Sequence, residues 1–200
     1  MNDGQARLLP LRLGIVNAFL LRGREKHVLV DTGTAGKLSA ISGHLERCGV
    51  SLTDIGLILV THAHPDHIGS LADIVQATGA KVVVHRQEVE HLRGIVPDIL
   101  VDDEFDLNLY GFAGKVIWTP GHTRGSVSVV LESGEAVVGD LVLPRFMAFG
   151  PPAIAFWAAS RDDSLASIRR VLELKPTAIF ASHGGPYRPE TVAGLVRSRA

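Results

Sequence analysis

The sequence predicts a mixed α+β fold in which two sheets stack face to face with helices on the outside. One reason is the order of the predicted elements: strand-rich stretches followed by helices occur twice, so each half of the chain forms a strand-and-helix unit. The other is that predicted strands ending at residues 60, 118, 139 and 181 are each followed closely by a histidine or an aspartate. Loops that follow strand ends can meet along one edge of a fold, so this pattern also predicts a shared functional site.

Length and composition are those of one globular domain, and we expect residues 1–200 to form it. Of the 200 residues 46% are hydrophobic, and 21 glycines with 10 prolines indicate many tight turns. The net charge is −1, and the sequence has no cluster of basic residues that could bind a phosphate backbone. No apolar run approaches membrane-spanning length. We therefore expect neither a nucleic-acid nor a membrane partner. With Cys48 as the only cysteine, expected to be a packed thiol, and no signal-peptide pattern, we expect a cytoplasmic protein.

In the first half of the chain, apolar runs between turn residues predict strands, and a 3.6-residue periodicity predicts helices. One helix carries apolar residues at 38, 41 and 45, and the next ends near Gly79. His27 opens a strand at its polar end, and we expect it to be exposed. The predicted strands span 8–13, 15–21, 27–30, 56–60 and 81–84, and the predicted helices span 35–48, 68–77 and 85–92.

In the second half, a hairpin about Ser133-Gly134 joins two apolar strands. The longest helix begins after Ser160, with Asp162 and Asp163 suited to its N-terminus, and Pro176 follows its end. The stretch 141–159 is apolar and irregular. The predicted strands span 104–109, 115–118, 127–131, 136–138 and 177–181, and the predicted helices span 162–174 and 189–196.

The most informative stretch is Thr61-His62-Ala63-His64-Pro65-Asp66-His67, between an apolar strand and a helix. Imidazole and carboxylate groups both suit zinc. Alternate side chains of an extended chain share a face, so His62 and His64 can reach one ion. The chain then turns, so Asp66 and His67 point elsewhere and suit a second ion. A solvated histidine-rich loop is the alternative, but this clustering between a strand and a helix favours metal binding.

Other strand ends carry single residues of the same chemistry. His122 lies in Pro120-Gly121-His122-Thr123, between Gly121 and Gly125 of the same loop. Asp140 follows Gly139, and His183 follows Ser182. Asp31, at the start of Asp31-Thr32-Gly33, is expected to orient the metal loop, a role compatible with an Asx-turn. Histidines that lack this clustered spacing, namely His44, His85 and His91, are predicted to lie outside the site.

Taken in chain order, these five motifs resemble those of the metallo-β-lactamase superfamily, and the resemblance covers 31–183. It implies a four-layer αββα sandwich with metal ions at one edge of the sheets. It also implies a dinuclear centre with two Zn²⁺ ions, iron or manganese being alternatives. In that assignment one ion is held by His62, His64 and His122, the other by Asp66, His67 and His183, and Asp140 bridges them. Asp31 would be the structural aspartate behind the loop.

The resemblance implies hydrolysis of a thioester, ester or lactone by a metal-bound hydroxide, with Asp66 orienting it and relaying a proton. Family members that act on β-lactams typically lack an aspartate at the place of Asp140, so its presence favours the glyoxalase II-like and lactonase-like branch. The chain ends soon after His183, and we therefore expect a hydrolase of minimal length. Three alternatives remain: a mononuclear-iron persulfide dioxygenase, a phosphodiesterase of the same fold and a non-catalytic binding protein.

The stretch 141–159 begins beside Asp140 and is too long for an ordinary connection. Exposing its aromatic side chains to water is costly, so we consider three locations in which they could be buried: the core, an interface with a second subunit of a homodimer, or the wall of a substrate cleft. We expect Phe146 and Met147 to line the cleft and Arg145 to bind an anionic group of a small-molecule substrate. For Phe156 and Trp157 the core beneath the last helix is the favoured location.

Overall fold

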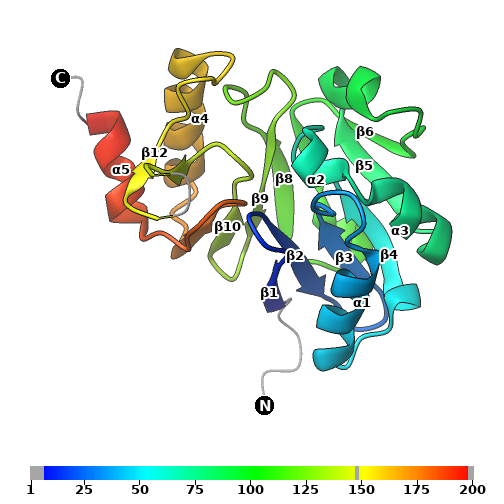
Figure 1. The fold of residues 1–200 in the computed structure, drawn as a ribbon. Coiled ribbons are helices and arrows are strands. Elements are labelled where there is room, and N and C mark those ends of the chain that lie inside the picture. Colours follow the sequence, from blue (N-terminus) through cyan, green and yellow to red (C-terminus); the bar gives the residue numbers. More distant parts are fainter. Residues whose placement is uncertain (1–6, 147–148, 198–200) are drawn as a thin grey trace. The chain divides into compact units, whose positions relative to one another are not determined.

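The computed structural model describes residues 7–146 and 149–197, which form two compact units, Met1–Val101 and Asp102–Ala200. In Figure 1 the first unit runs from blue to green and the second from green to red. Each unit has one main sheet and its own helices, as the repeated strand-and-helix pattern predicts. That residues 1–200 act as a single domain stays a prediction.

The first unit is built on a six-stranded sheet in sequential order. Strands β1 to β3 are antiparallel, whereas β3, β4, β5 and β6 run parallel to one another. The carboxyl ends of these parallel strands therefore lie at one edge of the sheet, which is where α/β proteins place their sites. The strands are β1 Arg7–Arg12, β2 Asn17–Arg22, β3 His27–Val30, β4 Ile55–Leu59, β5 Lys81–His85 and β6 Ile99–Val101.

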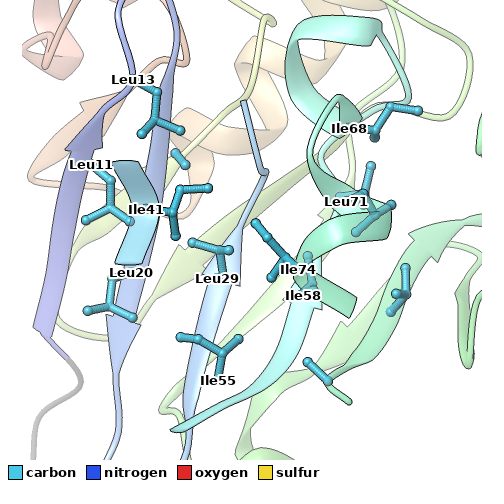
Figure 2. Close-up of a cluster of buried hydrophobic side chains, with 14 of the residues drawn as sticks. Leu11, Leu13, Leu20, Leu29, Ile41, Ile55, Ile58, Ile68, Leu71 and Ile74 are labelled. Carbon is cyan, nitrogen blue, oxygen red and sulfur yellow. The ribbon is translucent and has the colours of Figure 1, made fainter. Parts of the chain in front are cut away.

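Helices of the first unit bury their apolar sides against this sheet. Figure 2 shows Ile41 of α1 and Leu71 and Ile74 of α3 beside strand residues such as Leu29 and Ile58, and all five are fully buried. The helical segments are α1 Leu38–Arg47, α2 Pro65–Ile68 and α3 Leu71–Thr78, with 3-10 helices at Leu52–Asp54 and Arg86–His91.

The second unit has a five-stranded sheet in the order β13-β10-β9-β8-β7. β8 and β10 are both antiparallel to β9, and β13 is parallel to β10. Consequently β8, β10 and β13 run in one direction and end at the same edge. The strands are β7 Glu104–Asp106, β8 Gly114–Trp118, β9 Val127–Leu131, β10 Glu135–Val137 and β13 Ala178–Phe180, with a small hairpin of β11 Leu143–Pro144 and β12 Pro152–Ala153.

Two helices contribute to the core of the second unit. Leu165, Ile168 and Val171 of α4 and Val192 of α5 are buried in one cluster with strand residues that include Ile179. The side chain of Ser160 caps α4 by accepting a hydrogen bond from the Asp163 N–H at 3.1 Å, as the sequence predicts. The helical segments are α4 Arg161–Glu173 and α5 Pro189–Arg197, with a 3-10 helix at Leu107–Tyr110.

The structure corrects the sequence prediction in a few elements. The helix expected over 68–77 begins earlier and is interrupted, because α2 ends before Gly69 and α3 begins after Ser70. Strand β6 was not predicted, and the stretch expected to be irregular contains the β11–β12 hairpin. Among the described residues no helix is both long and apolar enough to cross a membrane.

Candidate metal centre

The central histidine motif lies directly beyond the carboxyl end of β4. His62 is fully buried and His64 is partly buried, and the Nε2 atom of His62 faces Nδ1 of His64 at 3.1 Å. The two rings meet edge to face, with centroids 4.6 Å apart. An extended segment thus turns two ring nitrogens toward one point, and that they are ligands of one ion stays a prediction.

Asp66 and His67 lie on the short helix that follows. Pro65 occupies its first position, where the missing N–H costs nothing, and His64 precedes it in an extended conformation (φ −70°, ψ 151°). His67 Nε2 lies 3.8 Å from Asp66 Oδ2, and the rings of His62 and His67 are 3.9 Å apart between centroids. The first unit therefore carries a continuous row of donor groups: His64, His62, His67 and Asp66.

Asp31 fixes this row from the end of β3, as the sequence predicts. Its carboxyl group is completely buried and accepts three hydrogen bonds: from the Thr61 N–H at 2.8 Å, from the Thr61 hydroxyl at 2.7 Å and from His67 Nδ1 at 2.8 Å. Because the carboxylate accepts from Nδ1, that nitrogen carries the proton and Nε2 is left as the ligand atom. Asp31 itself has φ 61°, a left-handed conformation that is uncommon outside glycine.

The residues after Asp31 also hold the motif. The Thr32 N–H and hydroxyl both donate to the His67 carbonyl, at 2.7 and 2.8 Å, and the Gly69 N–H donates to the Gly33 carbonyl at 2.9 Å. The backbones approach so closely that a Cβ at Gly69 would lie 2.5 Å from the Thr34 carbonyl carbon and 2.6 Å from the Pro65 carbonyl oxygen. Gly69 is therefore required by the approach of two backbones.

A second buried carboxyl group contacts the motif from the other side, and sequence reasoning did not find it. Glu88, in the 3-10 helix after β5, is 2% exposed, and its Oε2 accepts a hydrogen bond from the Ala63 N–H at 2.8 Å. The sequence also predicted no role for Thr61, which donates two hydrogen bonds to Asp31. The only local signal for Glu88 would have been its place just after a parallel strand neighbouring β4.

The second unit brings its three predicted ligands together at the edge where β8, β10 and β13 end. Asp140 Oδ2 lies 3.5 Å from Nε2 of His122 and 3.5 Å from Nε2 of His183. The His122 and Asp140 side chains are almost completely buried, and His183 is slightly exposed. Main-chain bonds beyond the strands, including Ser182 N–H to the Gly139 carbonyl at 3.0 Å, join the last two loops.

The loop of His122 is held by α4. The Ser160 N–H donates to the Gly121 carbonyl at 2.9 Å, the Ala159 N–H donates to the His122 carbonyl at 3.1 Å, and the Ser167 hydroxyl donates to the Pro120 carbonyl at 2.7 Å. A Cβ at Gly121, where φ is +142°, would lie 2.5 Å from backbone atoms of Ser164. The start of α4 thus fixes the position from which His122 projects.

Arg170 of α4 anchors the end of β8 just before this loop. Its guanidinium donates to the Trp118 carbonyl at 3.0 Å, to Asp103 at 2.7 Å and to Glu104 at 3.2 Å. The hydrogen bond with Asp103 is the main reason why the pKa of Arg170 is raised, and it lowers the pKa of Asp103. Lys115 is the main cause of the lowered pKa of Glu104. These partly exposed ion pairs contribute little to stability individually, but they fix the strand end.

Three histidines were predicted to lie outside the site, and in the described part of the chain none of them joins a group of potential metal ligands. His91 is exposed, while His44 lies at the flank of α1 with Nε2 3.0 Å from the Arg12 carbonyl. His85 is buried and caps its 3-10 helix. The expectation that His27 is exposed is wrong. It is 7% exposed, its Nδ1 accepts from the Gly23 N–H, and burial lowers its pKa.

The stretch 141–159 exposes its aromatic residues. Arg145 and Phe146 lie after β11 and are exposed, with the Phe146 ring 5.8 Å from that of Phe149, and Met147 lies outside the described residues. Phe156 and Trp157 are 93% and 51% exposed, so their expected location in the core is wrong. They contact each other edge to face, with centroids 4.6 Å apart, and leave the core to the neighbouring apolar residues Ile154 and Ala155.

The donor set fits borderline metal ions such as zinc. Each unit supplies imidazole nitrogens and one carboxylate at the end of its sheet, and buried hydrogen bonds orient several of them. The family model described as "Metallo-beta-lactamase superfamily" matches residues 11–183. The chain belongs to the metallo-beta-lactamase superfamily. Membership supports metal binding by this donor set, whereas the number and identity of the ions are left to the proposal below.

This chain is similar to several proteins that are named as hydrolases. It is 41% identical over 160 residues to a hydroxyacylglutathione hydrolase of Erythrobacter litoralis, covering 76% of this chain and 59% of the relative. It is 28% identical to a beta-lactamase-like protein 2 homolog of Caenorhabditis elegans, covering 92% and 62%. A probable metallo-hydrolase of Bacillus subtilis is 29% identical, covering 92% and 90%. The chain thus spans about three fifths of the length of some curated relatives.

A solved structure confirms the predicted metallo-β-lactamase-like α+β fold. The metallo-beta-lactamase family protein from Thermus thermophilus has a TM-score of 0.73 at 26% identity, covering 95% of this chain and 77% of the other. An archaeal superfamily member from Sulfolobus tokodaii has a TM-score of 0.66 at 23% identity, covering 96% and 85%. Such likeness shows the fold and leaves the substrate open.

Proposed function

We propose that this protein is a dinuclear zinc hydrolase that acts on a small thioester, ester or lactone in the cytoplasm. In this proposal the ligands of both units hold two ions together, with His62, His64 and His122 on one and Asp66, His67 and His183 on the other. Superfamily membership and the relation to a hydroxyacylglutathione hydrolase support it. The relative is named for its own substrate, and only the broader class of acyl substrates is proposed for this chain.

The observation that carries the proposal is the position of Asp140. One oxygen of this buried carboxylate lies 3.5 Å from a ring nitrogen of His122 and 3.5 Å from one of His183. Those two histidines are assigned to different ions, and a carboxylate between them suits a bridging ligand. A bridge offsets the repulsion between two cations and fixes their spacing, which two-metal hydrolysis requires.

The roles of the protein groups follow from their environments. Bound zinc would supply a water of lowered pKa and a Lewis acid for the acyl oxygen. Asp66 is the most exposed carboxylate of the ligand set, with 29% of its side chain exposed, and it can hold and pass on a proton. Asp31 keeps the Nδ1 proton of His67 in place, so that Nε2 stays directed away from Asp31.

For the substrate we propose that Arg145, Phe146 and Met147 form part of the binding surface. The β11–β12 hairpin begins at Leu143, three residues after Asp140, and its exposed tip carries a cation and aromatic rings. An exposed cation beside apolar surface suits a substrate with an anionic group and an apolar part. A homodimer formed through this hairpin is the competing proposal.

A substrate panel on zinc-loaded protein tests the function. Thioesters, lactones, simple esters and phosphodiesters would be compared at equal concentration, with Asp140→Ala as the inactive control. Turnover of a thioester, ester or lactone well above the control supports the proposal. Preference for a phosphodiester, or activity only with one iron per chain, dioxygen and a glutathione persulfide, would assign a different reaction to the same ligands.

A further inference from the structure

The histidine motif lies where β4 leaves its sheet. The ladder between β4 and β5 extends to Val60, whose N–H donates to the Val83 carbonyl at 2.9 Å. Beyond it, two main-chain N–H groups of the motif donate to side-chain carboxyl groups: Thr61 to Asp31 and Ala63 to Glu88, both at 2.8 Å. Asp31 follows β3 and Glu88 follows β5, the two strands that flank β4. The two carboxyl groups thus take the places of main-chain acceptors on neighbouring strands.

Glu88 contacts the peptide between two proposed ligands. The N–H of Ala63 belongs to the peptide group that joins His62 to Ala63, and Ala63 precedes His64. A hydrogen bond to that N–H fixes the plane of this peptide, which orients the backbone from which His62 projects and the start of the Ala63 backbone that leads to His64. The two rings meet at 3.1 Å between Nε2 and Nδ1.

The burial of Glu88 has an energetic cost that calls for a specific contact. A carboxyl group that is 2% exposed is costly unless hydrogen bonds satisfy it, and apolar residues fill most such positions. Nearby Glu90, in the same 3-10 helix, is exposed. The helix therefore buries one glutamate selectively, toward the motif.

We propose that Glu88 is a positioning residue that holds His62 and His64 in their metal-binding geometry through the N–H of Ala63. The inference rests on the proposed function for the role of the two histidines, whereas the contact itself belongs to the first unit alone. If the hydrogen bond is what matters, the length of the side chain counts and its charge does not. Glu88→Gln keeps the length of the side chain and an oxygen that can accept the hydrogen bond. Glu88→Asp keeps the charge, but its side chain is one methylene shorter, so its carboxyl oxygens lie further from the Ala63 N–H.

Cobalt(II) titration of metal-free protein, followed by visible absorption, tests this inference. Glu88→Asp should weaken cobalt binding by about 10–100-fold and alter the absorption spectrum, whereas Glu88→Gln should stay within about threefold of the unmodified protein. Glu90→Asp is the matched control and should change neither. Circular dichroism would establish that each variant is folded.

Hydrogen exchange of the metal-free proteins separates this inference from the proposed function. The Ala63 amide should exchange faster in Glu88→Asp and at the unmodified rate in Glu88→Gln. If the unmodified protein bound no cobalt, the proposed function would fail, and exchange at Ala63 would still decide the role of Glu88. Tight cobalt binding with unmodified exchange in Glu88→Asp, or losses in Glu88→Gln that match those of Glu88→Asp, would overturn the inference.

Discussion

The two units carry similar ligands but organise them differently. In the first unit all four proposed ligands lie within 62–67, after a single strand, and carboxyl groups that follow the two flanking strands support them. In the second unit each of three strands that run in one direction is followed by one proposed ligand, at 122, 140 and 183. The proposed ligands of the first unit therefore lie in a single loop that adjacent segments hold in place. Those of the second unit come together because three strands of one sheet end at the same edge.

This difference teaches where each half should be vulnerable. A contiguous loop keeps its ligand spacing through local conformation, so residues that brace the loop matter as much as the ligands. Ligands that come from separate strands depend on contacts with one another, and Asp140 lies 3.5 Å from a ring nitrogen of both His122 and His183.

Removing the central carboxylate of the second unit should have the largest effect. Asp140→Ala should lose one of the two ions and lower kcat/KM by at least about 100-fold, because two cations would lose the ligand that offsets their repulsion. The melting temperature of the metal-free protein should change little. Asp163→Asn, at an exposed position of α4, is the control. Full activity in Asp140→Ala would show that Asp140 is not a ligand.

Adding a side chain at Gly69, where two backbone segments of the first unit lie close together, should distort the 62–67 loop without changing a proposed ligand. Gly69→Ala places a methyl group 2.5 Å from the Thr34 carbonyl carbon, so we expect a loss of about 3 kcal/mol in unfolding free energy and weaker metal binding. Gly43→Ala in α1 meets only the end of the flexible Arg47 side chain, at 3.6 Å, and should stabilise by about 0.5–1 kcal/mol. Chemical denaturation measures both. Equal stability of the two variants would refute the bracing of the loop at Gly69.

The hairpin after Asp140 offers a smaller test, specific to the second unit. Phe146→Ala should raise KM about tenfold at unchanged metal content, since truncating an aromatic contact costs binding on the order of 1–2 kcal/mol. Phe156→Ala, which removes an even more exposed ring, is the comparison and should leave kinetics unchanged. A shift from dimer to monomer with intact kinetics would assign the hairpin to an interface instead.

The smallest expected effect is on the pH dependence of stability, through His27, which is not one of the proposed ligands of the first unit. Burial lowers the pKa of His27 in the folded protein, so below its ordinary pKa of about 6.5 the unfolded chain binds more protons than the folded one. The contribution of His27 to stability is therefore complete above that pH and is lost as the pH falls. His27→Asn should flatten this decline in metal-free protein, and His91→Asn, at an exposed position, should not. Parallel pH profiles of unfolding free energy for all three proteins would exclude the effect.

Local patterns predicted most of the fold and the candidate site. Apolar runs between turn residues located the central strands, and strand ends pointed to Asp31, the 62–67 motif, His122, Asp140 and His183. Asp31 and the motif lie at one edge of the first sheet, and His122, Asp140 and His183 lie together at one edge of the second. The spacing within 62–67 is a property of a single segment, and each of the other residues directly follows a predicted strand end, which is why a sequence shows them.

Features that depend on distant packing could not be predicted. Glu88 has the polarity of a surface residue, and only the position of Ala63 reveals why it is buried. His27 opens a strand among charged neighbours, yet the turn at Gly23 covers it. Phe156 and Trp157 have the polarity of core residues, but the cluster around α4 and α5 is filled by aliphatic side chains and leaves both rings exposed.

Counting metal ions tests the proposal that both sets of ligands serve one dinuclear centre. Native mass spectrometry of protein loaded with zinc and freed of excess would be compared for the unmodified chain, His64→Ala and His183→Ala. We expect close to two ions per unmodified chain and fewer in each variant, because in the proposed centre each unit supplies ligands. A single ion per unmodified chain under saturating metal, or undiminished binding in either variant, would contradict it.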